Sequence, residues 1–226
     1  YAGPRYMKNR PPYKLKTFIL IYNVIQILAN LWFVKEHISA GWFSEVSFIC
    51  GRRDEALEHS KSNVIKLLNV IWWLILLKLF DYVETCVFVL RKKQNQVSTL
   101  HVYHHVSNVT FLWYYLKYIL DERVTIVSLV NCGVHVIMYI YYFLAAWNPE
   151  FQHMLSPIKP YITKLQMVQF IMLVGILMQY VNPNCEAHTQ KNKITPIFIG
   201  NLFIFLYLFY DFYKKSYTDL PKQKNN

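Results

Sequence analysis

The sequence predicts an all-α membrane protein whose chain crosses the bilayer several times. Hydrophobic residues make up 54% of the 226 residues, and aromatic residues make up 17%. The apolar residues stand in blocks of about 20, the length that a helix needs to span a bilayer. Most of the Lys and Arg residues, which give a formal net charge of +11, gather between the blocks. We expect these cations to meet lipid headgroups or a phosphate-bearing substrate, and we expect no nucleic-acid partner because the sequence has no soluble basic domain.

Six apolar blocks form the expected transmembrane spans within a single domain of residues 1–226. Charged or proline-bearing stretches separate the blocks and mark the expected helix ends. The spans cover about residues 15–38, 64–90, 101–120, 124–147, 161–181 and 194–213, and a basic tail of residues 214–226 follows.

The distribution of positive charge orients these spans. The N-terminal and C-terminal segments and two connections on the same side carry 14 of the 24 Lys and Arg residues, whereas the connections on the opposite side carry 9. Because cytosolic loops are enriched in Lys and Arg, both ends are expected in the cytosol. Lys222 and Lys224 resemble a dilysine retrieval signal for the endoplasmic reticulum, and a solvated basic tail is the alternative.

Three histidines open the third expected span and form the first candidate site. His101, His104, His105 and Asn108 stand at i, i+3, i+4 and i+7, so on a helix they form one polar stripe. Ionisable groups at membrane depth are costly, which favours a functional site that faces protein or water. An imidazole can act there as nucleophile, acid, base or metal ligand.

Polar side chains on three further spans point to a shared interior. Lys78 and Asp81 stand at i, i+3 on the second span, so they can neutralise each other, for structure alone or within a site. His135 on the fourth span is either a packing histidine or a partner of the stripe. The other polar residues of these faces are Glu84 and Thr85, then Asn131, Tyr139 and Tyr142, and then Thr163, Gln166 and Gln169. Amides often join helices, but polar groups on four spans favour an enclosed reaction chamber.

Other functions remain possible for an HxxHH cluster. It could be one box of a membrane di-iron desaturase or hydroxylase, but only four of the 8 histidines are expected at the chamber, too few for two irons. A mononuclear zinc site is possible by number, although no carboxylate or Cys has a partner position on the same helix. A pore or a lipid transporter would need a continuous polar path, whereas the far halves of the spans are apolar. The pattern is typical of a closed slot for a long acyl chain.

Four motifs in order resemble the ELO family, the elongases of very-long-chain fatty acids. The first resembles KxxExxDT followed by FVLRKK, the second is HxxHH preceded by Val-Ser, and the others match NxxHxxMYxYY and TxxQxxQF. They stand at residues 78–85 with 88–93, 101–105 with 97–98, 131–142 and 163–170. Asp81 stands where the motif usually has Glu, and Glu84 stands where it usually has Asp. Both positions keep their negative charge, and arthropod-type members of the family tolerate such swaps.

The resemblance also implies the fold. The family has seven spans, six of which form a barrel of two inverted three-helix units around a closed acyl tunnel. The segment that begins at Tyr1 resembles the region just after the first family helix. We therefore expect an N-terminal fragment or a deliberately shortened chain, with the chamber intact.

The reaction implied is the condensation of a long-chain acyl-CoA with malonyl-CoA, which gives a 3-oxoacyl-CoA, CO2 and CoA. It needs no metal or redox cofactor. The expected setting is the membrane of the endoplasmic reticulum, with a possible homodimer and with other enzymes of the elongation cycle as partners.

The resemblance assigns roles to the candidate residues. His104 is the expected nucleophile, with His105 and His101 as orienting or proton-shuttling groups and His135 holding a carbonyl. The rival is direct attack without a covalent acyl-enzyme. The expected substrate-binding residues are Lys78, Asp81, Glu84, Asn131, Tyr139, Tyr142, Gln166 and Gln169, with Arg91, Lys92 and Lys93 for the CoA phosphates.

Two further expectations concern the side opposite the cytosol. Cys50 and Cys185 both fall in connections on that side, and in an oxidising lumen they are expected to form a disulfide. Two free thiols are the alternative. The preference for acyl chain length should depend on the closed end of the slot, with Phe170, Leu173, Leu202 and Phe205 as candidate lining residues.

Overall fold

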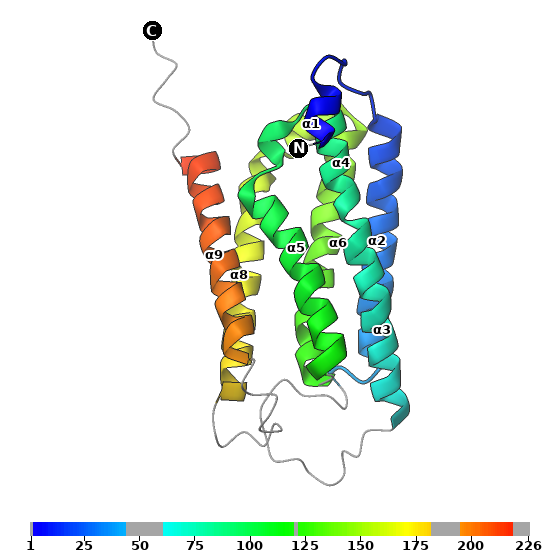
Figure 1. The fold of residues 1–226 in the computed structure, drawn as a ribbon, viewed down its shortest axis with the longest axis vertical. Helices are drawn as coiled ribbons and strands as arrows, with labels where there is room; N and C mark the ends of the chain where they lie inside the picture. The colour runs from blue at the N-terminus through cyan, green and yellow to red at the C-terminus, as the bar shows by residue number, and fades with distance from the viewer. Residues whose placement is uncertain (1, 44–60, 120–121, 182–194, 219–226) are drawn as a thin grey trace.

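A computed structural model describes residues 2–43, 61–119, 122–181 and 195–218, and its long elements are α-helices (Figure 1). The helices are α1 Ala2–Met7, α2 Lys16–Ser39, α3 Lys61–Phe80, α4 Tyr82–Leu90, α5 Thr99–Tyr114, α6 Ile126–Trp147, α7 Pro149–Met154, α8 Lys159–Met178 and α9 Thr195–Tyr213. Cys50, Cys185, Lys222 and Lys224 lie outside the described residues, so the disulfide and the retrieval signal stay predictions.

Four helices of the described part are long and apolar enough to cross a membrane. They are α2, α6, the segment Pro149–Met178 that contains α8, and the segment Thr195–Thr218 that contains α9. The prediction of a multi-pass helical membrane protein is confirmed at this level. The second and third expected spans fall on α3 with α4 and on α5, which are not among the four, and α5 has 16 residues.

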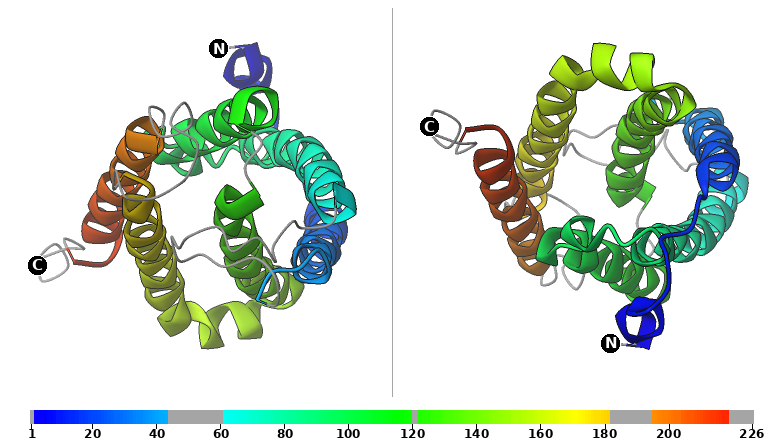
Figure 2. Two further views of the ribbon diagram at one scale, coloured as in Figure 1. Left: turned by 90° about the horizontal axis from the view of Figure 1, so that it is seen from below. Right: turned by 90° about the horizontal axis from the view of Figure 1, so that it is seen from above.

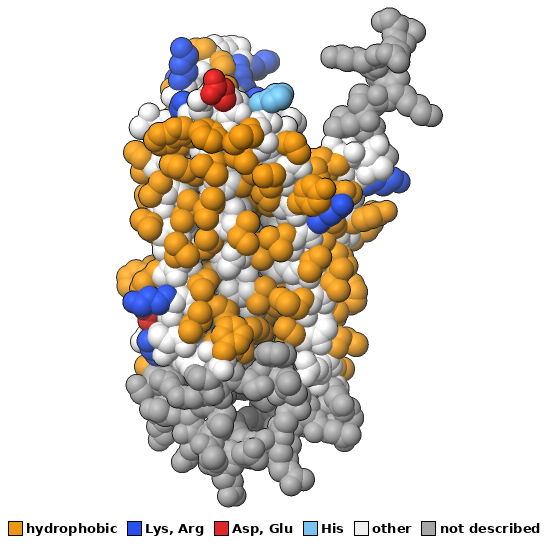
Figure 3. All heavy atoms as spheres, turned by 180° about the vertical axis from the view of Figure 1, so that it is seen from behind, with side chains coloured by type: hydrophobic (Ala, Val, Ile, Leu, Met, Phe, Trp, Pro, Cys, Tyr) orange, Lys and Arg blue, Asp and Glu red, His pale blue; other side chains and the backbone are white. Residues whose placement is uncertain are grey.

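On the face that Figure 3 shows, the middle of the molecule is apolar and the charged side chains lie toward its ends. On α2 the apolar side chains Ile25 and Leu28 are exposed, whereas the amides Gln26 and Asn30 are completely buried. A helix of a soluble protein has the opposite distribution, with its apolar face in the core. Polar groups turned inward and apolar groups turned outward are what a lipid environment selects.

The long helices run roughly along one axis, and seen end-on they form a ring, with one end of α6 leaning into its middle (Figure 2). α2 packs along α6, α8 packs along α9, and α5 contacts both α3 and α9. The N-terminal helix α1 and the C-terminal end of α9 lie at the same end of the molecule (Figure 1).

α3 and α4 differ from the single continuous helix that the sequence predicts over residues 64–90. The helix is interrupted at Asp81, which keeps right-handed helical angles of φ −58° and ψ −24°. The Asp81 N–H still donates to the Leu77 carbonyl, at 3.0 Å. The two helices therefore continue in nearly the same direction, and the break falls at the residue whose carboxylate turns into the bundle.

A buried network joins α2 to α6 near the end of α2. His37 Nδ1 lies 2.8 Å from the Phe33 carbonyl, and its Nε2 lies 2.7 Å from Ser128 Oγ. The Trp42 indole N–H donates to Thr125 Oγ1 at 2.8 Å. These contacts give partners to polar groups that lipid could not hydrate.

We expect Ser128→Ala to lower the free energy of unfolding by about 1–3 kcal/mol, because it leaves the buried His37 Nε2 without its partner. Thermal melting in detergent should fall by several degrees. Ser39→Ala is the matched control, since Ser39 is an exposed serine on the same helix as His37. Equal melting temperatures for the two variants would contradict this account.

Candidate active site

Ser98 starts α5 in the register that the histidine stripe requires. Its hydroxyl oxygen accepts a hydrogen bond from the His101 N–H at 3.2 Å, which caps the helix N-terminus. The first turns of α5 then carry the three histidines on one side. The ring centroids of His101 and His105 are 4.3 Å apart, and those of His104 and His105 are 5.6 Å apart.

His104 and His135 face each other across the bundle. Their rings, from α5 and α6, are 6.3 Å apart between centroids and lie 28° from parallel. Phe205 and Phe209 of α9 lie on another side of His104, at 5.1 Å and 6.2 Å between ring centroids. The expectation that imidazoles from two spans converge in the interior therefore agrees with the structure. Phe205, which is expected from the sequence at the closed end of an acyl slot, lies directly beside His104.

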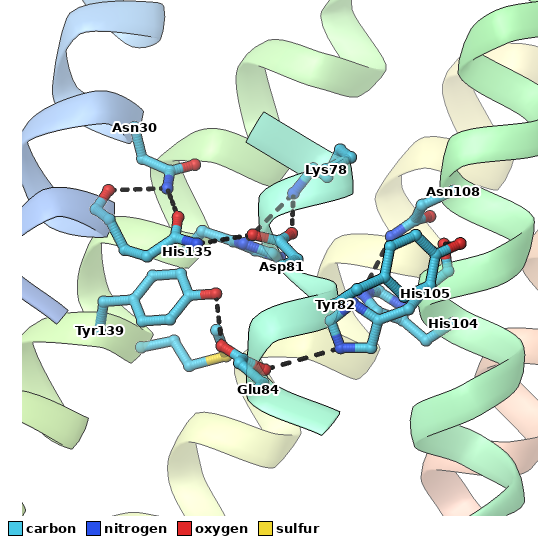
Figure 4. A network of polar contacts seen from close by, with 12 residues as sticks. Asn30, Lys78, Asp81, Tyr82, Glu84, His104, His105, Asn108, His135 and Tyr139 are labelled. Carbon is cyan, nitrogen blue, oxygen red and sulfur yellow. Dashed lines mark hydrogen bonds and ion pairs between the residues drawn. The ribbon is translucent and has the colours of Figure 1, made fainter. Parts of the chain in front are cut away.

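Lys78 fixes which nitrogen of His135 carries the proton. Lys78 Nζ lies 3.4 Å from His135 Nδ1, and an ammonium group can only donate. His135 Nδ1 must therefore accept, and the neutral ring carries its proton on Nε2. Lys78 Nζ also lies 3.4 Å from Asp81 Oδ2, and both side chains are almost fully buried. The predicted pairing of Lys78 with Asp81 is thus present, and it extends to His135 (Figure 4).

α2 contributes a row of polar groups that the sequence reading missed. The Gln26 amide donates to Asp81 Oδ1 at 2.7 Å and lies 2.7 Å from the Tyr22 hydroxyl. The Asn30 side-chain amide donates to the backbone carbonyl of Gln26 at 2.8 Å. The signal was available, because Tyr22, Gln26 and Asn30 repeat every four residues on an apolar helix. Through Gln26, this row of side chains positions the Asp81 carboxylate, which pairs with Lys78.

Glu84 joins the other end of the cluster. Its Oε1 accepts from the Tyr139 hydroxyl at 2.7 Å and from the Tyr22 hydroxyl at 3.3 Å. Its Oε2 lies 3.6 Å from His105 Nε2. The carboxylate thus orients the His105 ring, in the way that a carboxylate orients the histidine of a catalytic triad.

Glu84, His101 and His105 also bring three possible metal-ligand atoms within 4.8 Å of one another. Oxygen and imidazole nitrogen ligands of this kind suit zinc. Each residue has other partners as well, since His101 Nε2 lies 2.8 Å from Thr85 Oγ1. The donor set fits either a metal or a hydrogen-bonded proton network.

Several predicted residues lie apart from the histidines. Tyr142 is 42% exposed, with its ring 6.2 Å from that of Tyr139. The Gln166 amide donates to Met138 Sδ at 3.4 Å. Within the described part of the chain, neither Asn131 nor the buried Gln169 hydrogen-bonds to the cluster. The basic residues expected to bind the CoA phosphates are exposed at the C-terminal end of α4: Arg91, Lys92 and Lys93.

The four residues expected at the closed end come together between α8 and α9. Phe170, Leu173, Leu202 and Phe205 belong to one apolar cluster of buried side chains. This cluster borders the histidines through Phe205, whose ring centroid is 5.1 Å from that of His104. An apolar region thus adjoins the polar site directly.

This arrangement can capture an electrophilic carbonyl. His104 Nδ1 is buried and has no hydrogen-bond partner among the described residues. His135, opposite, presents an Nε2–H that can donate. The facing helices α5 and α6 thus bring a possible nucleophile and a possible proton donor close together, which are the two groups that nucleophilic attack on a carbonyl needs.

Comparisons with known proteins show the family to which the chain belongs. The ELO, GNS1/SUR4 family profile matches residues 1–225. Very long chain fatty acid elongase 4 of Mus musculus is 33% identical over 224 residues, which cover 99% of this chain and 69% of the mouse protein. A very long chain fatty acid elongase of Aedes aegypti is 35% identical over 224 residues, which cover 98% of this chain and 60% of the mosquito protein. From its site and its sequence together, the chain belongs to the ELO family.

Proposed function

We propose that this protein is a fatty acid elongase that condenses a long-chain acyl-CoA with malonyl-CoA to a 3-oxoacyl-CoA, CO2 and CoA. The names of the related proteins support elongation of very long chain fatty acids. The observation that carries the mechanism is the pairing of His104 with His135 at 6.3 Å between ring centroids. The buried apolar cluster beside His104 is the proposed place for the acyl chain.

The proposed first half-reaction transfers the acyl group to His104. An imidazole nitrogen attacks the thioester carbon, a C–N bond forms, and the C–S bond breaks so that CoA leaves as a thiolate. The His135 Nε2–H, set by Lys78, donates to the oxygen on which negative charge develops. Splitting the condensation in two replaces one difficult step with two easier ones.

The second half-reaction uses malonyl-CoA. Loss of CO2 breaks a C–C bond and leaves the electron pair on the α-carbon, and this carbanion attacks the acyl-imidazole carbon. The C–N bond then breaks, its electron pair returns to His104, and the 3-oxoacyl-CoA is released. The free CoA thiolate takes a proton from solvent, which completes the balance.

The proposed topology is a barrel of six spans that opens to the cytosol, within the endoplasmic reticulum membrane. The long helices follow a ring in end-on view, and both ends of the described chain lie at one end of the molecule (Figures 1 and 2). Arg91, Lys92 and Lys93 lie at that end, where they could meet the phosphates of CoA. We propose that the reaction uses no metal or redox cofactor.

Replacing the proposed nucleophile tests the covalent step. After incubation with acyl-CoA alone, intact-mass analysis of the wild-type protein should show an acyl adduct, and His104→Ala should lack it. His104→Ala should also lower malonyl-CoA-dependent CO2 release at least about 100-fold. His153→Ala, an exposed histidine on α7, is the matched control and should match the wild type. An adduct that persists in His104→Ala would falsify the assignment, and a wild type without an adduct would favour direct attack.

The Lys78 pair can be separated into its structural and chemical parts. Lys78→Met leaves Asp81 buried without its cation, and we expect a loss of about 3–5 kcal/mol in stability. The double variant Lys78→Met with Asp81→Leu removes the unpaired charge and should regain much of the melting temperature. Its turnover should stay low, because His135 has lost the donor that fixes its proton on Nε2. A double variant with wild-type turnover would limit Lys78 to a role in folding.

Chelation separates the condensing enzyme from a metal enzyme. We expect CO2 release by purified protein to stay within about twofold of its initial rate after dialysis against EDTA, since each proposed step uses imidazole and hydrogen bonds alone. Loss of turnover that Zn2+ or Fe2+ restores would instead assign a metal to Glu84, His101 and His105. Dependence on iron and oxygen would favour a desaturase.

A further inference from the structure

Asn108 contacts the proposed nucleophile from one turn further along α5. Its amide Nδ2 lies 3.0 Å from His104 Nε2. The two residues are spaced i, i+4 on one helix, so the backbone itself holds the amide over this edge of the ring. The other ring nitrogen, Nδ1, is buried and lacks a hydrogen-bond partner in the described residues. The two nitrogens of His104 thus have opposite surroundings.

The amide can meet the ring in two ways, because its oxygen and nitrogen ends have the same shape. With Nδ2 toward the ring, His104 Nε2 accepts and Nδ1 carries the proton. That places an N–H donor in a buried position without an acceptor, which is rare and costly in proteins. With Oδ1 toward the ring, the His104 Nε2–H donates to Asn108 and Nδ1 carries the lone pair.

We infer that Asn108 is a positioning residue that holds the proton of His104 on Nε2, and that Nδ1 of His104 is the atom acylated. This inference rests on the proposed function. Nδ1 is the nitrogen left free for a carbonyl carbon, whereas Nε2 is covered by the amide. The rings of His135, Phe205 and Phe209 surround His104 and limit the access of water to it.

The proposed step balances without a separate base. The Nδ1 lone pair forms the C–N bond, the C–S bond breaks, and the thiolate departs with its electron pair. The ring becomes an acyl-imidazolium whose proton stays on Nε2, hydrogen-bonded to Asn108 Oδ1. Because no proton leaves the ring, the same hydrogen bond serves both half-reactions, and the cationic ring is a better leaving group when the carbanion attacks.

The test uses a long-chain 2-bromoacyl-CoA as an alkylating probe. A nitrogen of His104 forms a C–N bond to the α-carbon, and bromide leaves. The bond survives acid hydrolysis, which releases a carboxyalkyl-histidine substituted at Nδ1 or at Nε2. The two isomers can be separated by chromatography against synthetic standards. We expect wild-type protein to give the Nδ1 isomer.

Two variants distinguish positioning from packing. Asn108→Leu keeps the volume but removes the hydrogen bond, so both tautomers are populated. We expect a mixture of isomers and single-turnover acylation slower by about 10-fold or more, with the KM for acyl-CoA changed less than about threefold. Asn108→Asp offers only acceptor oxygens, so it should keep the Nδ1 isomer and acylate within about fivefold of the wild type. Thr110→Val, an exposed position on α5, is the control and should behave as the wild type.

Three results would overturn the inference. They are an Nε2 isomer from the wild type, an unchanged isomer and rate in Asn108→Leu, and loss of the Nδ1 isomer in Asn108→Asp while Asn108→Leu keeps it. The proposed function is tested separately by CO2 release from malonyl-CoA. An Nε2 label with normal CO2 release refutes the role of Asn108 alone, and an Nδ1 label without CO2 release refutes the condensation alone.

Discussion

Charged groups inside this protein must be paired inside it, because the lipid-facing surface offers no partner for them. The Lys78–Asp81 pair depends most on this constraint, since both charges are almost fully buried. Gln26 donates from α2 to one oxygen of the Asp81 carboxylate, and Lys78 directs a second N–H to His135 on α6. One ion pair therefore positions three segments of the chain and fixes the proton of the histidine that faces the nucleophile.

A second carboxylate organises the other half of the site. Glu84 accepts hydrogen bonds from Tyr139 and Tyr22 through one oxygen, and it faces His105 with the other. Tyr22 lies in hydrogen-bond range of Gln26 as well, so the two carboxylates share a single scaffold on α2. Asp81 stands at the interruption of the helix and Glu84 stands three residues later, and because the backbone stays nearly helical both acids lie on the inner side. Charge and geometry at the histidines thus depend on the two carboxylates and on the α2 side chains that hold them.

The sequence was most informative where spacing along one helix decides proximity. The stripe of His101, His104 and His105 and the pairing of Lys78 with Asp81 follow from helix periodicity, and the structure contains both. The row of Tyr22, Gln26 and Asn30 has the same periodicity but lies outside every motif, and its meaning depends on an acid 55 positions away from Gln26. The proton positions on the imidazoles could not be predicted, since they depend on contacts between helices. Tyr142 lies beside Tyr139 but is partly exposed, and its exposure could not be predicted from its place in a motif.

The inward row of α2 has a consequence for biosynthesis. In water, solvent molecules hydrogen-bond to the side chains of Gln26, Asn30 and His37. Lipid offers no hydrogen-bond partners, so these polar groups lower the stability of α2 in the bilayer until other helices pack against it. His37 Nδ1 meets the Phe33 carbonyl of its own helix, but His37 Nε2 meets Ser128, which leaves the ribosome 91 residues later. The last hydrogen bond of this early helix is therefore completed only after α6 has been synthesised, so the packing of α2 ends late in the synthesis of the chain.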